Sequence, residues 1–580
     1  MKKIILNTFI ATASLLSVTA CSDSILDTEP LDTFSAEIVW SDPNLAQSFV
    51  YNSAHDIVSY YLSTSTEKSS NLASGGDDFT DNIATWKTTS AFKVGKSQMD
   101  HYFDMGWSAF DLIRKANLII ENGQKSEGIP AIEKPGFIAQ GHMLRALVYF
   151  KQAKLFGKYV IVDKVLTPED ELALPRTNTI KETYDFILSD LDFAIANLPE
   201  SGENGTLTKG FALALKAEVA LHGAAYIESG QEDYYNQCIE ASETLFAMGK
   251  YAIDSDYKGL INDYTHSQSS AEMIFAMWRS SDITLFKDTP MQKMVPNCEV
   301  DKLKADAIPQ LVENFVGWPE RVPTWDLSTA YLVIDEDGIA KKYDETQYYK
   351  DWQNKGGYVS SFLWKNRDAR FEASLAHDST YLFKNLITTR VGGNCDRYML
   401  VKGQQSASRS GFWMRKGLYE QTQLLAKNNT SYCYPICRLG RSYLNYAEAL
   451  LRIGRTADAV SAMNVTRTQH GQLPALTTTD AAEVWKYYKI ERRVELFYEC
   501  SDRYWSLLRW AKADGKETIP ELNHGVKYLE ISADGKSYEI QETFQDAVNN
   551  TLSWESRRFL FPVPQTQREL NTNLDQNPGW

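Results

Sequence analysis

Three aspartates stand close together in the segment SGGDDFTD, which runs from Ser74 to Asp81. Hard cations such as Ca²⁺ prefer clustered carboxylate oxygens, so Asp77, Asp78 and Asp81 have the chemistry of a calcium loop. The bidentate Glu of an EF-hand is missing, however, and a polar turn between helices uses the same residue types. A motif this short is weak on its own. We therefore predict a turn at this segment, without a bound metal.

The spacing motifs that would indicate catalysis are missing from the chain. The eight histidines are scattered, and no His-Glu-x-x-His zinc motif occurs. No Gly-x-Ser-x-Gly nucleophile elbow occurs either, and Gly95-Lys96-Ser97 lacks the upstream glycine of a phosphate loop because Ser90 occupies that position. A glycosidase needs two carboxylates facing across a cleft, and the 75 acidic residues leave that alternative open. We predict a protein that is not an enzyme and needs no cofactor.

The first twenty residues have the features of a signal peptide. Two lysines precede an apolar stretch, and small residues lead to Ala20-Cys21. A cysteine at this point indicates lipoprotein processing, with Cys21 as the diacylated N-terminus; an ordinary secretory cleavage that leaves a free thiol is the alternative. Several acyl chains on one residue hold a protein stably on a bilayer. Ser22 follows the cysteine in place of Asp, which favours the outer membrane.

Composition narrows the range of partners. The 580 residues carry a formal net charge of −15, and so acidic a protein repels phosphate backbones and anionic lipid heads. We therefore expect no nucleic acid partner. After the signal peptide no apolar run approaches the roughly 18 residues of a spanning helix, so the protein should be anchored to a membrane without crossing it. Six widely spaced cysteines remain, which we interpret as buried apolar residues with one disulfide bridge left open.

Helical periodicity dominates the chain outside its middle part. Apolar residues recur at helical spacing in 107–122, 137–157, 180–198 and 211–228. The clearest pair lies between Arg441 and His470, where two helical stretches of tetratricopeptide length flank Gly454. Units of this kind bury their apolar faces by stacking on their neighbours. The predicted fold is mainly α, a scaffold of tetratricopeptide-like helical pairs.

The pattern of apolar residues changes between about Ser280 and Tyr434. Tryptophans, glycine pairs and irregular stretches replace the helical pattern, and Tyr331 to Ile334 alternates like a short strand. A loop-rich insert on a rigid helical body is where binding residues usually lie. The predicted organisation is a signal peptide at 1–20, a tether at 21–33, an N-terminal helical region at 34–279, a loop-rich ligand-binding insert at 280–434 and a C-terminal helical region at 435–580.

Two blocks near the end of the chain carry a family resemblance. They are IERRVELFYECSDRYWSLLRW, from Ile490 to Trp510, and FLFPVPQTQRELNTNLDQNPGW, from Phe559 to Trp580. Together with the lipoprotein signal and an ordered series of shorter blocks, they make the chain similar to the SusD-like (RagB/SusD) family of outer-membrane nutrient-binding lipoproteins, from Cys21 onward. Cys500 stands where the family usually has Gly, and Ser506 where it often has Asp. These two departures concern local packing.

The resemblance implies a function as well as a fold. Proteins of this family sit as a lid over a SusC-like TonB-dependent transporter in the outer membrane and hand it oligosaccharides, without catalysis. The resemblance thus implies a surface-exposed lipoprotein on the cell outer membrane. The composition is compatible with a sugar ligand, since 14 Trp, 31 Tyr and 25 Phe leave aromatic rings to spare for the apolar faces of pyranoses.

We place the ligand site on three tryptophans in the loop-rich segments, Trp86, Trp318 and Trp352, with Asp78 or a neighbour contacting sugar hydroxyls. Burial of each ring in a satellite core is an equally good interpretation, since Trp is usually largely buried. Two other functions stay open. A member of the same family could capture peptides, because the scaffold does not determine what its loops bind. The third interpretation is a glycoside hydrolase.

Overall fold

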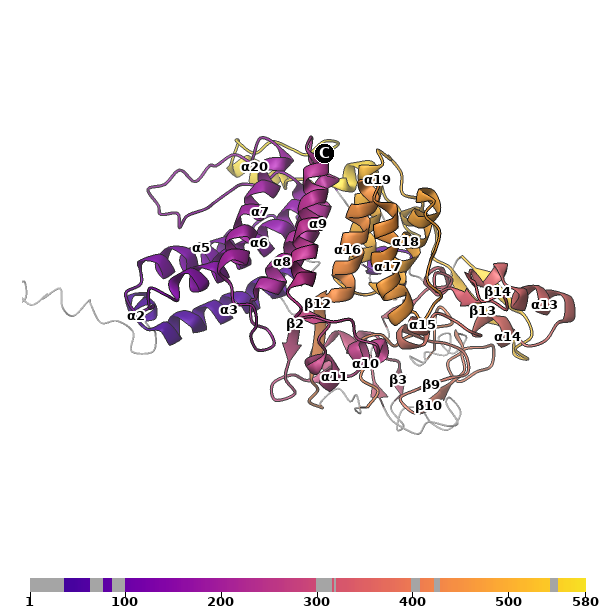
Figure 1. Ribbon diagram of the computed structural model, residues 1–580. Coiled ribbons are helices and arrows are strands. Elements are labelled where there is room, and N and C mark those ends of the chain that lie inside the picture. Colours follow the sequence, from indigo (N-terminus) through magenta and orange to yellow (C-terminus); the bar gives the residue numbers. More distant parts are fainter. Residues whose placement is uncertain are drawn as a thin grey trace, which may run out of the picture.

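The computed structural model describes residues 36–62, 77–85, 100–298, 315–317, 320–397, 407–421, 428–542 and 551–580. Figure 1 shows an elongated molecule in which long N-terminal helices form one end and a second group of helices packs beside them. Short strands and short helices fill the space below the second group and form the opposite end. The mainly α fold predicted from the sequence is confirmed.

Antiparallel helices form the N-terminal part, and their ends follow local sequence signals. Thr179 and Thr208 accept hydrogen bonds from the backbone N–H groups of Glu182 and Phe211, which caps two of these helices at their N-termini. Gly157, with φ 69°, ends another as the sequence predicts. The helices are α2 (Ala36–Ser41), α3 (Pro43–Leu62), α5 (Phe110–Lys125), α6 (Lys134–Phe156), α7 (Ile180–Asn197), α8 (Lys209–Ala224), α9 (Gln231–Ala247), α10 (Tyr257–Asn262) and α11 (Tyr264–Ser269).

The middle of the chain consists of short elements, and its described strands pair two by two in antiparallel ladders. The ladders are β1 (Ile83–Thr85) with β5 (Arg321–Pro323), β2 (Met273–Arg279) with β12 (Tyr432–Arg438), β3 (Asn297–Cys298) with β4 (Phe315–Val316), β6 (Val333–Ile334) with β7 (Ala340–Lys341), β8 (Leu375–Ala376) with β11 (Trp413–Met414), and β9 (Thr380–Leu382) with β10 (Asn385–Ile387). Between them lie η2 (Asp77–Phe79), η3 (Phe286–Asp288), η4 (Pro290–Lys293), η5 (Tyr343–Glu345), α12 (Trp325–Ser328), α13 (Gln347–Lys355), α14 (Ser360–Leu363) and α15 (Ala369–Ser374).

The C-terminal part returns to helices. The pair predicted between Arg441 and His470 is confirmed, and its turn contains Gly454 with φ 82°. The elements are α16 (Leu439–Arg452), α17 (Thr456–Gln469), α18 (Ala481–Glu495), α19 (Asp502–Ala513), η7 (Pro520–Leu522), the hairpin of β13 (Tyr528–Ile531) and β14 (Tyr538–Gln541), η8 (Ser556–Phe559) and α20 (Gln565–Leu570).

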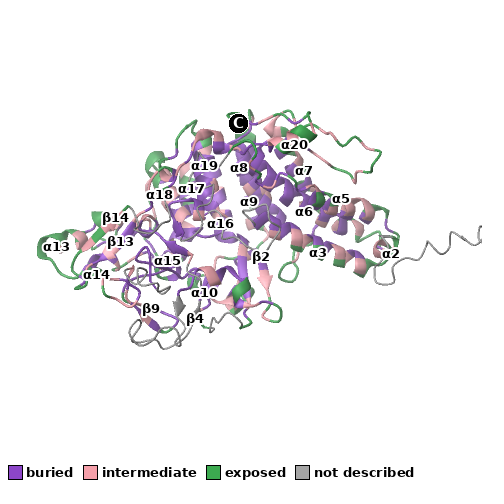
Figure 2. Ribbon diagram, turned by 180° about the vertical axis from the view of Figure 1, so that it is seen from behind, coloured by how far each residue is buried: buried purple, intermediate pink, exposed green. Residues whose placement is uncertain are grey.

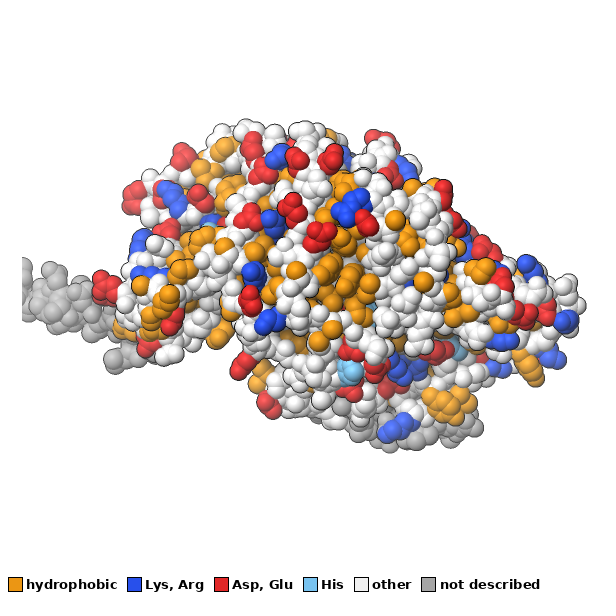
Figure 3. All heavy atoms as spheres, in the orientation of Figure 1, with side chains coloured by type: hydrophobic (Ala, Val, Ile, Leu, Met, Phe, Trp, Pro, Cys, Tyr) orange, Lys and Arg blue, Asp and Glu red, His pale blue; other side chains and the backbone are white. Residues whose placement is uncertain are grey.

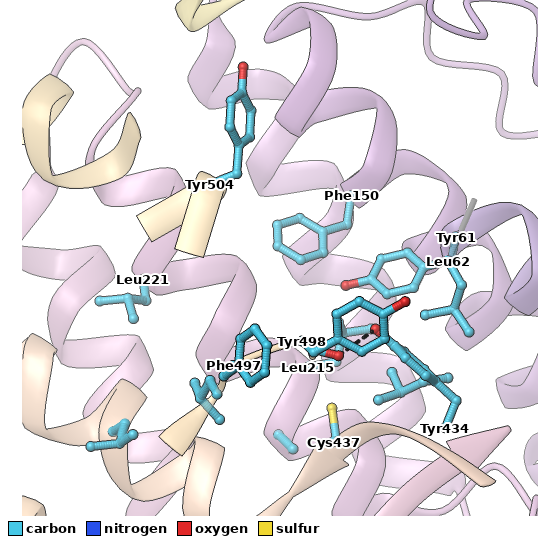
Figure 4. Close-up of a cluster of buried hydrophobic side chains, with 14 of the residues drawn as sticks. Tyr61, Leu62, Phe150, Leu215, Leu221, Tyr434, Cys437, Phe497, Tyr498 and Tyr504 are labelled. Carbon is cyan, nitrogen blue, oxygen red and sulfur yellow. Dashed lines mark hydrogen bonds between the residues drawn. The ribbon is translucent and has the colours of Figure 1, made fainter. Parts of the chain in front are cut away.

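One continuous core joins the two helical groups. Figure 2 shows buried residues running from α6 and α8 into α16 and α19. Figure 4 shows part of this core, where Tyr61 and Phe150 from the N-terminal helices lie near Tyr434, Tyr498 and Cys437 from the second half of the chain. The space-filling view in Figure 3 shows apolar side chains gathered between α9 and α16. The two groups of helices therefore form a rigid body on which the short elements are mounted.

The cysteines are thiols wherever the structure describes their side chains. Cys238, Cys395, Cys433 and Cys437 are buried and Cys500 is partly buried, each without a disulfide partner. This agrees with their interpretation as small apolar residues. None of the described helices is long and apolar enough to cross a membrane.

Candidate functional site

Two of the three predicted tryptophans and the predicted lipid attachment site, Cys21, lie outside the described residues. The described ladder of β1 and β5 nevertheless fixes where two of these segments start. Thr85, which directly precedes Trp86, pairs with Arg321, three positions after Trp318.

Asp78 lies beside this ladder and contacts Arg321. The Nε–H of Arg321 donates to both carboxylate oxygens of Asp78, at 3.0 and 2.7 Å, and the Asp78 side chain is 13% exposed. The ion pair fastens η2 to β5 across 243 positions of sequence. Asp78 therefore supports the β1–β5 ladder, and its contact with a ligand hydroxyl stays a prediction.

The neighbouring aspartates are held by the C-terminal helices. Asp81 contacts Arg493 of α18 at 3.0 Å and Arg503 of α19 at 3.2 Å. Burial alone would raise the pKa of Asp81, but the two guanidinium groups outweigh it and lower the pKa below its ordinary value. Asp77 is fully buried and accepts a hydrogen bond from the backbone N–H of Tyr498. Burial raises its pKa to about 7, although that hydrogen bond opposes the shift.

The polar turn predicted for this segment is therefore more buried than its sequence suggests. The aspartates that resemble a calcium loop bind partners that lie hundreds of positions away in the sequence. One of these partners is Arg503, which is 422 positions from Asp81. These arginines supply the positive charge that a cation would otherwise provide. Arg321 was not among the predicted site residues. The only feature of the sequence that points to Arg321 is its position three residues after Trp318.

Trp352 lies in a helix, not in a loop as the sequence analysis expected. Thr346 caps α13 through the N–H of Tyr349, and Gly356, with φ 69°, ends it. The indole of Trp352 is partly exposed, and its Nε1–H donates to the carbonyl of Gly357 at 3.1 Å. The ring stacks on Tyr349 with a centroid distance of 5.9 Å and an interplanar angle of 26°.

Further aromatic rings connect Trp352 to the β1–β5 ladder. Tyr538 lies 5.7 Å from the Trp352 ring and 6.1 Å from that of Trp325, and Trp325 follows β5 by two residues. Figure 1 shows α13 beside β13 and β14 at the far end of the molecule. Trp352 thus belongs to an aromatic cluster that reaches back to the β1–β5 ladder through Tyr538 and the buried Trp325.

Among the described residues, Glu272, His470 and Glu495 have ligand atoms close enough for a metal, all within 4.8 Å of one another. Arg438 forms ion pairs with both glutamates, because its Nη1 lies 2.9 Å from Glu272 and 2.5 Å from Glu495. Burial would lower the pKa of His470, but Glu495 and Glu272 outweigh it and raise the pKa to about 10. The charges are thus paired, which makes this cluster a structural ion network that links α18 to the residue after α17 and the residue before β2.

Family models cover most of the chain. The model described as "SusD family" matches residues 271–580, and the model described as "Starch-binding associating with outer membrane" matches residues 39–221. The helical pairs and the connected short elements fit this class, and the chain belongs to the SusD family.

Individual relatives are distant. A SusD-like protein of Bacteroides ovatus is 26% identical over 230 residues, which span 39% of this chain and 40% of that protein. A SusD-like protein of Formosa agariphila is 24% identical over 539 residues, or 87% of this chain and 91% of that protein.

Solved structures share the fold. A SusD-like protein from Bacteroides fragilis has a TM-score of 0.74 at 24% identity, with 95% of this chain and 100% of that chain covered. A protein described as a laminarin-binding SusD-like protein has a TM-score of 0.59 at 17% identity, with 93% and 100% covered. At these identities the likeness establishes the fold.

Proposed function

We propose that this chain is a non-catalytic cell-surface lipoprotein that binds oligosaccharides and delivers them to a SusC-like TonB-dependent outer-membrane transporter. The observation that carries the proposal is the β1–β5 ladder, in which Thr85, the residue before Trp86 in the sequence, pairs with Arg321, whose side chain binds Asp78. The aromatic cluster around Trp352 adjoins the same ladder through Trp325. An extended ligand with flat apolar faces suits several aromatic platforms in a row.

The chemistry of the supporting residues agrees with a neutral ligand. Asp78 and Asp81 are neutralised by arginines, so the base of the site presents little net charge. Pyranose rings place apolar C–H faces on indole and phenol rings, while polar groups orient the hydroxyls. A neutral saccharide therefore fits better than a charged peptide, which remains the alternative ligand. Two solved relatives, described as a laminarin-binding SusD-like protein and as surface glycan-binding protein A from Bacteroides fluxus, support a glycan.

The signal-peptide features and the family support a proposal for the location of the protein. One matching model describes proteins associating with the outer membrane. We propose that Cys21 carries the lipid and that the protein is exposed on the cell surface. If so, it should co-purify in mild detergent with a large TonB-dependent barrel. Purification of the protein alone, under conditions that preserve other such pairs, would argue against this partner.

A binding screen on the soluble form, residues 22–580, tests the proposed ligand class. The probes are starch, laminarin, xylan and mannan in affinity gels, with a peptide mixture as the competing ligand class. We expect retardation by at least one polysaccharide and no new reducing ends after long incubation. Retention of peptides alone would favour the peptide-capturing alternative, and release of reducing ends would favour a glycoside hydrolase.

A further inference from the structure

Two clefts meet at the loop between α7 and α8, far from the aromatic cluster around Trp352. The first has a volume of about 280 Å³ and lies between α3, α6 and this loop; its lining includes Gln47, Tyr51, Gln140, Gly205 and Thr206. Figure 1 shows the loop emerging below α3, beside β2.

The second cleft lies on the other side of the same loop. It has a volume of about 180 Å³, and its lining includes Glu203, Tyr251 and Trp278 together with Gly205 and Thr206 of the first cleft. A Cβ atom at Gly205 would lie 3.9 Å from the indole of Trp278, so the glycine backbone passes directly beside that ring. The shared residues make the clefts adjoining halves of one groove, with Tyr51 in one half and Trp278 in the other.

The first half of the groove is uncharged although the protein is acidic. Its described lining includes no Asp, Glu, Lys, Arg or His, and Tyr51 is 65% exposed. Gln47 and Gln140 exchange hydrogen bonds through their side-chain amides, at 3.0 and 3.2 Å. Because a primary amide has two N–H donors and two lone pairs on its oxygen, each partner keeps one of each for a ligand.

The second half adds groups that suit hydroxyl-bearing ligands. Trp278 is partly exposed and packs edge to face on Tyr264, with a centroid distance of 5.8 Å. Glu200, Glu203 and Lys250 are exposed at the rim, where the carboxylates can accept hydrogen bonds from hydroxyls and the ammonium group can donate them. Exposed aromatic rings, unused amide groups and a rim carboxylate together favour a neutral polyhydroxylated chain over an apolar or an anionic ligand.

We propose that this groove is a second saccharide-binding site, which takes a neutral oligosaccharide along the path from Tyr51 over Gly205 to Trp278. The inference rests on the proposed glycan-binding function and adds a site on a different face of the scaffold. A polysaccharide long enough to reach both sites would bind with a higher overall affinity, without new contacts at the first site.

The test compares Tyr51→Ala with Tyr381→Ala, a control tyrosine on β9 with nearly the same exposed fraction, 64% against 65%. The probes are the neutral polysaccharide that wild type binds best in the screen and its hexasaccharide, measured by calorimetry. We expect Tyr51→Ala to weaken polysaccharide binding about tenfold, the effect of losing one stacking platform, and to reduce hexasaccharide stoichiometry from two to one. Tyr381→Ala should bind as wild type does.

A second variant fills the groove without removing a platform. Thr206→Trp places a large ring where the two clefts join and should also reduce the stoichiometry to one. Wild-type affinity and stoichiometry in both Tyr51→Ala and Thr206→Trp would overturn the second site and leave the proposed function intact. A wild-type protein that binds none of the polysaccharides would overturn the proposed function and this site with it.

Discussion

Cys500 has a backbone conformation that L-residues rarely adopt. Its φ is 49°, and Tyr498 and Ser501 have φ values of 61° and 60°. The left-handed region costs a non-glycine residue roughly 1–2 kcal/mol, which gives a physical reason for the glycine that the family usually has here. The Cys500 N–H donates to the hydroxyl of Tyr434 at 2.8 Å, so the surrounding structure holds the turn in place.

Substitution at this position separates backbone strain from side-chain packing. Cys500→Ala and Cys500→Gly both remove the thiol, which lies 3.6 Å from the carbonyl oxygen of Pro435. Since only glycine relieves the left-handed strain, Cys500→Gly should be more stable than Cys500→Ala by about 1 kcal/mol in denaturant unfolding. Equal stability of the two variants would show that the turn is unstrained.

The ion pairs of Asp81 have a large expected effect on stability. Asp81→Asn leaves the buried Arg503 and the partly buried Arg493 without their shared carboxylate, and loss of one partner of a buried ion pair typically costs about 3–5 kcal/mol. Asp337→Asn is the matched control, because the Asp337 side chain is 47% exposed in its ion pair with Lys341 and should contribute less than about 1 kcal/mol. Urea unfolding measures both, and equal small losses would refute the clamping role of Asp81.

At the scale of elements, a protonated His470 helps to join α17 to α18. Its Nδ1 lies 2.8 Å from Glu495 and its Nε2 lies 3.0 Å from Glu272. Because the folded-state pKa of about 10 exceeds the ordinary 6.5, the folded protein holds this proton more tightly than the unfolded chain. The stabilisation is complete below pH 6.5 and is lost as the pH rises toward 10.

The raised pKa of His470 predicts that the free energy of unfolding decreases as the pH rises. Between pH 7 and 9 the wild type should lose roughly 2 kcal/mol of unfolding free energy through His470, since one pKa unit corresponds to about 1.4 kcal/mol. His470→Gln cannot carry the charge, so its stability should be lower at pH 7 and should fall less over the same interval. Parallel pH profiles for the two proteins would exclude a charged His470.

The helices could be predicted from the sequence, whereas the ion pairs of Asp78 and Asp81 beside the candidate site could not. Segments such as 180–198 repeat apolar residues at helical spacing between clear end signals, so local sequence suffices. By contrast, α13 is short and mostly polar, and Trp352 looked like a loop residue. Asp78 resembled a solvated turn residue because its partner, Arg321, is 243 positions away and only the tertiary fold brings them together.

At the scale of the whole molecule, we propose that a lipid anchor on Cys21 determines where the binding surfaces operate. Cys21→Ala removes the proposed acceptor for the acyl chains and should release the protein from membranes or leave it unprocessed, because the acyl chains supply the membrane affinity. Fractionation after a carbonate wash, in cells that lack the partner transporter, measures this. A variant that still fractionates with the outer membrane would show that Cys21 is not the anchor.

The central claim is that neutral glycan binds on the tryptophan platforms next to the β1–β5 ladder. Calorimetry with the best polysaccharide of the screen tests it most directly, on Trp86→Ala, Trp318→Ala and Trp352→Ala beside wild type. Each platform should contribute on the order of 1–3 kcal/mol, so loss of two should abolish a micromolar-to-millimolar interaction while the melting temperature stays unchanged. Wild-type affinity in all three variants, with unchanged melting temperatures, would contradict the account and remove these residues from the site.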